Sequence, residues 1–128
     1  MRYLLLISAD ENAAAPASAP AGLAADAEPA GAGPVAAGGA LTFAEWLADV
    51  ERRGVLEVHA GLHPSDTATT VRRRADEVLL TDGPFLEGRE QVGGLALLNC
   101  RDLDEAIEIA AAHPAAAFGQ VEIRPVRP

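Results

Sequence analysis

The two most apolar segments of this 128-residue chain do not alternate between apolar and polar residues, and this constrains the fold more than any other feature. Tyr3–Ile7 is a run of consecutive apolar side chains, too short for a helix and followed by a segment rich in helix breakers, so it predicts a buried strand. Leu95–Leu98 has the same character. Because a strand with one buried face alternates, we expect both faces of these strands to be covered.

The first helix is expected over residues 42–53. Thr42 and Glu45 form a capping box at its start, and Gly54 follows as the C-terminal stop. Apolar residues recur at i, i+3, i+4 and i+7 and predict one buried stripe, made of Phe43, Trp46, Leu47 and Val50.

A second helix is expected over residues 103–112, with a capping box of Asp102 and Glu105. His113-Pro114 ends it, and His113 is expected to act as a cation near the negative end of the helix dipole. The inward stripe is predicted to consist of Leu103, Ala106, Ile107 and Ala110.

The predicted strands complete an α+β domain. Strands are expected over residues 2–8, 55–62, 92–99 and 120–126, with a hairpin of Thr69–Arg74 and Glu77–Thr81 turning at Ala75-Asp76. Apart from the extra β-hairpin, the order is βαββαβ, the ferredoxin-like arrangement, with two helices on one face of an antiparallel sheet. The other face would be bare, so we expect a homodimer in which a second copy covers it.

We expect residues 1–128 to form a single domain. Residues 11–40 contain 14 Ala, 5 Gly and 4 Pro and can bury little apolar surface against the entropy of ordering, so they predict a flexible insertion. The competing interpretation is an Ala-rich helix, which the four prolines would break.

The charge balance argues against several classes of partner. The formal net charge is −9, so nucleic acid is not expected. The one basic cluster, Arg72–Arg74, is flanked by Asp76 and Glu77 and is interpreted as a solvated strand edge. No apolar run is long enough to span a bilayer. Cys100 is the only cysteine, which suits a reducing cytoplasm.

Several motifs together carry a family resemblance. They are Thr67–Arg72, Val78–Phe85 with Asp82-Gly83-Pro84-Phe85 at its end, Glu90–Gly94, Asp102–Ala106 and Val121–Val126. This combination resembles the DGPF branch of the YCII-related proteins. The resemblance implies a ferredoxin-like, dimeric α/β barrel, a bacterial setting, and an association with extracytoplasmic-function sigma factors.

Asp82 is the first candidate for chemistry. A carboxylate at a strand end, held by Gly83 and the fixed φ of Pro84, could act as a general acid or base, and the resemblance implies a histidine–aspartate pair for such work. A plain turn explains the same residues, with the Asp side chain bonded to nearby amides. Both interpretations stay open at this stage.

His59 and His63 are the histidines nearest the expected pocket, and imidazole titrates near neutral pH. His59 is paired with Asp82 in the catalytic hypothesis, and His63 is a candidate ligand-binding residue; each could instead be a polar residue at a strand edge. Phe85 is a candidate pocket lid. Gly93 and Gly94 are expected to allow close backbone approach at a pocket or dimer contact.

No cofactor or metal is expected, because the three His and one Cys show no ligand spacing, and Cys100 is expected to be a small buried thiol. Proton transfer on a small molecule by Asp82 and His59 is therefore the chemistry that the residues support. The alternatives are a non-catalytic ligand-binding or regulatory module, which the resemblance would link to a sigma factor, and an interaction protein acting through residues 11–40. The sequence leaves open whether the protein is an enzyme.

Overall fold

The computed structural model describes residues 1–12 and 41–128. The flexible insertion predicted over residues 11–40 therefore lies almost entirely outside the described residues and stays a prediction. Among the helices of the described ranges, none is long and apolar enough to cross a membrane.

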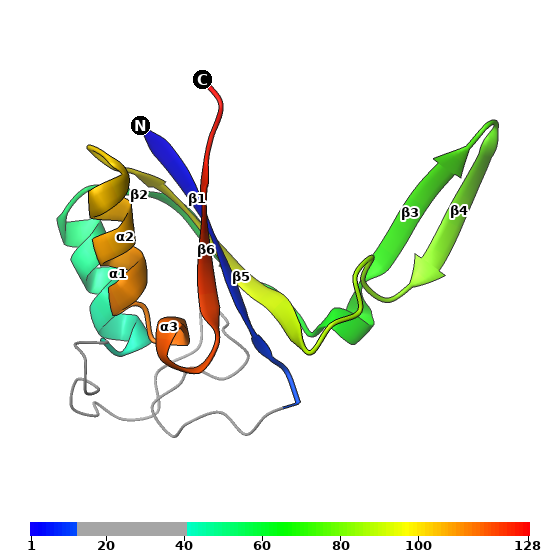
Figure 1. Cartoon of the computed structure of the whole chain (residues 1–128), viewed down its shortest axis with the longest axis horizontal. Coiled ribbons are helices and arrows are strands. Elements are labelled where there is room, and N and C mark those ends of the chain that lie inside the picture. Colours follow the sequence, from blue (N-terminus) through cyan, green and yellow to red (C-terminus); the bar gives the residue numbers. More distant parts are fainter. Residues whose placement is uncertain (13–40) are drawn as a thin grey trace.

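The described chain forms a four-stranded antiparallel sheet, three helices, a short 3-10 turn and a separate hairpin (Figure 1). The sheet order is β2-β5-β1-β6, the strand order of a ferredoxin-like fold, so the α+β prediction is confirmed. The strands of this sheet are β1 (Arg2–Asp10), β2 (Leu56–Gly61), β5 (Glu90–Asn99) and β6 (Gln120–Pro125). The hairpin consists of β3 (Thr69–Arg74) and β4 (Glu77–Asp82), and the helical elements are α1 (Phe43–Arg52), η2 (Ser65–Thr67), α2 (Leu103–Ala112) and α3 (Ala115–Phe118).

The two central strands bury one face completely and the other only in part. In β1, Tyr3, Leu5 and Ile7 are buried, whereas Leu4 and Leu6 between them remain partly exposed. The same alternation runs through β5, where Ala96 and Leu98 are buried and Leu95 and Leu97 are partly exposed. The apolar runs therefore reflect two different environments, a helix-covered face and a second face that the described residues leave open.

Helix α1 follows the sequence prediction closely. Thr42 accepts a hydrogen bond from the Glu45 amide at 3.2 Å, and the Glu45 carboxylate accepts in return from the Thr42 amide. Phe43, Trp46 and Val50 are buried against the sheet. The indole Nε1 of Trp46 donates to the backbone oxygen of Ile109 at 2.9 Å and so joins α1 to α2.

Helix α2 has the predicted limits but a different buried stripe. Leu103 and Ile107 are about half exposed, so their predicted inward position was wrong. In the predicted capping box the Glu105 carboxylate would accept from the amide of the N-cap residue, Asp102. It accepts instead from the Arg101 amide at 2.9 Å, one residue before the N-cap. This bond satisfies Glu105 on the inner face and lets the helix turn Ile109 inward. The buried residues of α2 are Glu105, Ala106, Ile109 and Ala110.

His113 is a core residue, so the predicted role as a cation at the helix end was wrong. Its side chain is 2% exposed, and its ring lies edge-on to Trp46 with centroids 4.7 Å apart. Nδ1 accepts a hydrogen bond from the Ala115 amide at 3.0 Å. Burial lowers the pKa of His113 to about 4, so the imidazole is neutral at pH 7.

The hairpin stands away from the body as an arm, which we define as residues 69–82 (Figure 1). Its strands were predicted correctly, with Ala75 and Asp76 at the turn. The two strands pair with each other, and neither joins the four-stranded sheet. In Figure 1 the arm projects on the side of the sheet opposite α1 and α2.

Candidate functional site

The base of the arm is fixed to the segment that precedes β3. The Gly83 amide donates to the Ala68 oxygen at 2.7 Å, and the Thr70 hydroxyl donates to the Gly83 oxygen at 2.8 Å. Gly83 has φ +101°, a conformation that a side chain would strain. Glycine at this position lets the chain leave β4 and turn back toward the body.

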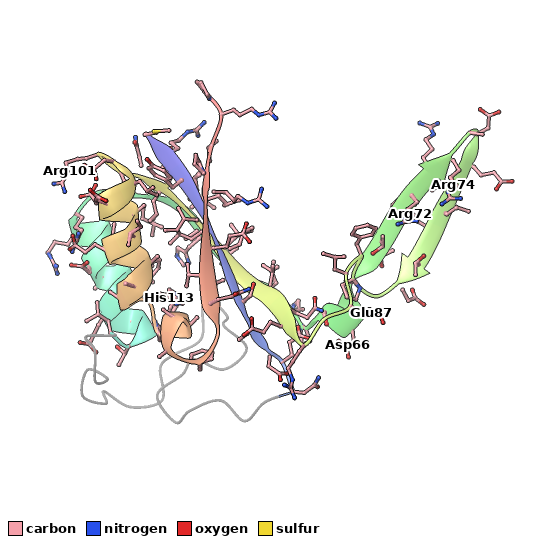
Figure 2. The ribbon with its side chains drawn as sticks, viewed as in Figure 1. Asp66, Arg72, Arg74, Glu87, Arg101 and His113 are labelled. Atoms are coloured by element: carbon pink, nitrogen blue, oxygen red, sulfur yellow. The ribbon has the colours of Figure 1, made fainter. Side chains whose placement is uncertain are left out.

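A cleft of about 370 Å³ opens at this base. Its volume falls at the lower end of the range of small-molecule sites in proteins. Figure 2 shows Asp66 and Glu87 at the junction between arm and body. The lining comes from η2, the end of β4, the loop after it and the start of β5, and consists of Ser65, Asp66, Asp82, Gly83, Pro84, Glu87, Gly88 and Gln91.

Hydrogen bonds hold two walls of the cleft in place. The carboxylate of Glu11 accepts from the Ser65 amide at 2.7 Å and from the Ser65 hydroxyl at 2.6 Å. The side-chain amide of Gln91 donates to the backbone oxygens of Leu86 and Gly88, at 3.2 and 3.0 Å. Glu11, at the start of the predicted insertion, is therefore tied to the site, and the loop before β5 is braced on itself.

The charged residues that line the cleft are all acidic. They are Asp66, Asp82 and Glu87, one from each of three segments. Ionised carboxylates only accept hydrogen bonds, so the cleft suits a ligand that presents N–H or O–H donors or a positive charge. Within residues 1–12 and 41–128, no three His, Cys, Asp or Glu side chains are grouped closely enough to hold a metal ion.

The Asp82 carboxylate is not used by its own turn. Its backbone pairs with Thr69, and the turn after it is held by Ala68 and Thr70. Among the described residues, no hydrogen bond or ion pair to the Asp82 side chain is formed. The carboxylate is thus available on the wall of the cleft.

His59 lies elsewhere, in the main sheet. It pairs with Ala96 in β5, and its ring contacts Phe43 of α1 with centroids 6.5 Å apart. Its Nδ1 is buried without a hydrogen-bond partner among the described residues. Ala96 is five residues along β5 from Gln91 of the cleft, a distance of roughly 17 Å at the rise of a strand. The structure therefore does not bring His59 and Asp82 together.

The other sequence candidates also lie outside the cleft lining. His63 is exposed in the loop between β2 and η2. Phe85 is exposed, and the guanidinium carbon of Arg72 lies 5.0 Å from its ring centroid. Gly93 and Gly94 are buried inside β5. Of the six candidates from the sequence, Asp82 alone lines the cleft.

Sequence reasoning missed Asp66, Glu87 and Gln91. A signal was present, because a hairpin brings together the two segments that flank it, and both flanking segments carry acidic residues. Asp66 precedes β3 and Glu87 follows β4, so a paired hairpin places them at the same end of the arm.

The fold and the cleft define a ferredoxin-like α+β protein with a hairpin arm and an acidic cleft at the base of the arm. The model of the YCII-related domain matches residues 1–128, so the chain belongs to the YCII-related family. It is similar to an uncharacterised protein of Rhizobium meliloti (strain 1021), with 39% identity over 88 residues, which cover 62% of this chain and 69% of that protein.

Proposed function

We propose that this protein binds a small organic molecule in the cleft at the base of the arm, with Asp82 as its main hydrogen-bond acceptor. The observation that carries this proposal is the free Asp82 carboxylate on the wall of a cleft of about 370 Å³. A turn aspartate with a purely structural role would bond to the amides of its own turn. The Gly83 amide instead donates to the Ala68 oxygen, and Pro84 has no amide hydrogen to offer.

The ligand class follows from the lining. Asp66, Asp82 and Glu87 supply acceptors and negative charge, so an amine or a polyhydroxylated compound complements the cleft better than an anion does. The cleft carries three carboxylates and opens to solvent beside the exposed loop at Glu87. These features favour a hydrophilic ligand over an apolar one.

Proton transfer on such a ligand is the second candidate function. The accessible carboxylate of Asp82 supports it, because a general base must be able to approach the proton that it removes. Because His59 lies away from the cleft, Asp82 would act in this role without a histidine partner. A non-catalytic binding module would use the same contacts and differ only in lacking turnover.

A thermal-shift screen tests the binding proposal. Small amines, amino alcohols and polyols are added to the wild type, to Asp82→Asn and to the matched control Asp76→Asn, which lies at the turn of the arm and outside the cleft. A ligand that binds the folded state raises the unfolding temperature. We expect a shift in the wild type and the control that is lost in Asp82→Asn. Equal shifts in all three proteins, or none in the wild type, would contradict the proposal.

We also propose that the open face of the four-stranded sheet is covered by a second copy. The partly exposed leucines of β1 and β5 and the half-exposed Val58 of β2 support this, since such a face resembles the apolar centre of an interface. Light scattering should give the mass of a dimer or a larger assembly, reduced by Leu97→Lys but not by Ile107→Lys on the outer face of α2. A monomeric wild type would refute the contact.

A further inference from the structure

One face of the arm is apolar and has nothing to cover it among the described residues. In the β3–β4 register, Val71 lies opposite Leu80 and Arg73 lies opposite Val78, so these four side chains share a face. Val71, Val78 and Leu80 are 62%, 59% and 67% exposed. The side chains of the opposite face are mostly polar, so the two faces of the arm have different character.

A free-standing arm of this kind needs external packing. A two-stranded hairpin alone is marginally stable in water, and here neither strand pairs with the body. Three neighbouring apolar side chains on one face are therefore the part of the arm most in need of a partner. Figure 2 shows the arm extending well clear of the helices and the main sheet.

The same face carries opposite charges at its two ends. The base has the Thr69–Asp82 pair, the middle has Val71–Leu80, and the tip has Arg73–Val78. Asp82 and Arg73 each lie two residues from the middle pair, or about 7 Å along the strand. Neither side chain forms an ion pair within the described ranges. The face is thus acidic, then apolar, then basic from base to tip.

We propose that this face binds the same face of a second copy, with the two arms antiparallel about a two-fold axis near Val71 and Leu80. Reversing one arm places its basic end over the acidic end of the other, and the apolar middles meet. Asp82 on β4 would then lie diagonally across from the partner's Arg73 on β3, one strand over and within reach of its long side chain, at both ends of the contact. A two-fold interface must be self-complementary in this way.

The charge of the arm favours a second copy over an unrelated acidic or basic partner. The whole chain has a net charge of −9, so two copies repel each other over most of their surfaces. Residues 69–82 carry three arginines and three acidic residues and are neutral as a unit. The arm is therefore a surface where two acidic copies can approach without that repulsion.

The contact changes the composition of the cleft. Asp82 forms part of its wall, so the partner's Arg73 would bring a guanidinium to a lining whose own charges are all negative. The cleft becomes a site shared by two chains. The shared site rests on the proposed ligand function. The contact between the arms does not rest on it, and this contact uses a surface distinct from the open face of the main sheet.

Thiol crosslinking tests the contact. Stacked β-faces lie about 10 Å apart, too far for a disulfide, so a short bismaleimide is the appropriate reagent. Leu80→Cys places a thiol beside the two-fold axis, and Thr81→Cys places one next to it in sequence on the opposite face. Both sites are exposed, so neither change disturbs a core, and the native Cys100 is buried.

We expect covalent dimer to form at least about tenfold faster for Leu80→Cys than for Thr81→Cys, because association raises the local thiol concentration. Adding Arg73→Glu to the Leu80→Cys variant should slow crosslinking, and adding Arg73→Glu together with Asp82→Arg should restore the rate. Equal rates at the two positions would overturn the contact, and a rate insensitive to charge reversal would overturn the antiparallel arrangement. Neither readout involves ligand, so failure here is distinct from failure of the ligand screen.

Discussion

Protonation of His113 should destabilise the fold at acidic pH. The imidazole is enclosed by Trp46 and Phe43, with ring centroids 4.7 and 6.1 Å away, and its Nδ1 accepts from the Ala115 amide. A proton on Nδ1 would remove this acceptor and leave a buried charge among aromatic rings. In the unfolded chain the same imidazole is solvated and titrates near its ordinary value.

The magnitude follows from the two pKa values. The pKa of His113 is about 4 in the folded protein, against 6.5 for an unperturbed histidine, a gap that corresponds to about 3 kcal/mol. Because the folded state binds fewer protons, this contribution is fully present above pH 6.5. It is lost progressively as the pH falls from 6.5 to about 4.

Urea unfolding followed by circular dichroism between about pH 7.5 and pH 4 measures the effect. His113→Asn is the matched variant, since an amide oxygen can accept from Ala115 but does not titrate. Carboxylates contribute equally to both proteins, so the difference between the two pH profiles isolates His113. The wild type should lose about 3 kcal/mol more than the variant over this range. Parallel profiles would refute the assignment of a buried, neutral imidazole.

Three further changes test the packing of the body. Trp46→Phe should cost about 2 kcal/mol in urea unfolding, because it leaves the Ile109 oxygen without its donor and opens a void; a cost below about 0.5 kcal/mol would contradict that bond. Gly119→Ala would place a Cβ 2.1 Å from the Ser8 oxygen, so it should lower the free energy of unfolding by about 3 kcal/mol or more; an unchanged melting temperature would argue against this close approach. Burial raises the pKa of the Cys100 thiol, so alkylation should be slow in the native protein and fast in urea; equal rates would place the thiol at the surface.

Much of the fold was predictable because local signals agreed with the tertiary structure. The Thr42–Glu45 box set the start of α1, and the Ala75-Asp76 turn set the hairpin register. The non-alternating run Tyr3–Ile7 marked a strand that lies between two others in the sheet. Each of these features depends on neighbours in sequence, which a pattern can represent.

The errors arose where a distant contact decided the outcome. Two possible buried stripes of α2 share Ala106 and Ala110. Side-chain hydrophobicity favoured the stripe that contains Leu103. The stripe that contains Ile109 is buried instead, because the Glu105 carboxylate has a hydrogen-bond partner on the inner side of the helix. The position of His113 after the end of a helix predicts a protonated imidazole, but Trp46 from α1 packs against the ring and excludes water from it. No local pattern contains those contacts.

The candidate site was only partly accessible to sequence reasoning. Asp82 was found because its motif is distinctive, but a turn and a binding role use the same residue types. Asp66 and Glu87 join it only because the hairpin closes at its base. His59 was expected close to the site along the chain, yet its strand directs it toward Phe43.

The central claim is that the cleft beside Asp82 binds a small ligand, and amide chemical shifts test it most directly. A hit from the amine and polyol screen is titrated into ¹⁵N-labelled protein, and the backbone signals of Gly83, Gly88 and Gln91 are followed. We predict saturable shifts at these three amides, abolished by Asp82→Asn, with little change at His59. Shifts centred on His59, with the three cleft amides unmoved, would contradict the account.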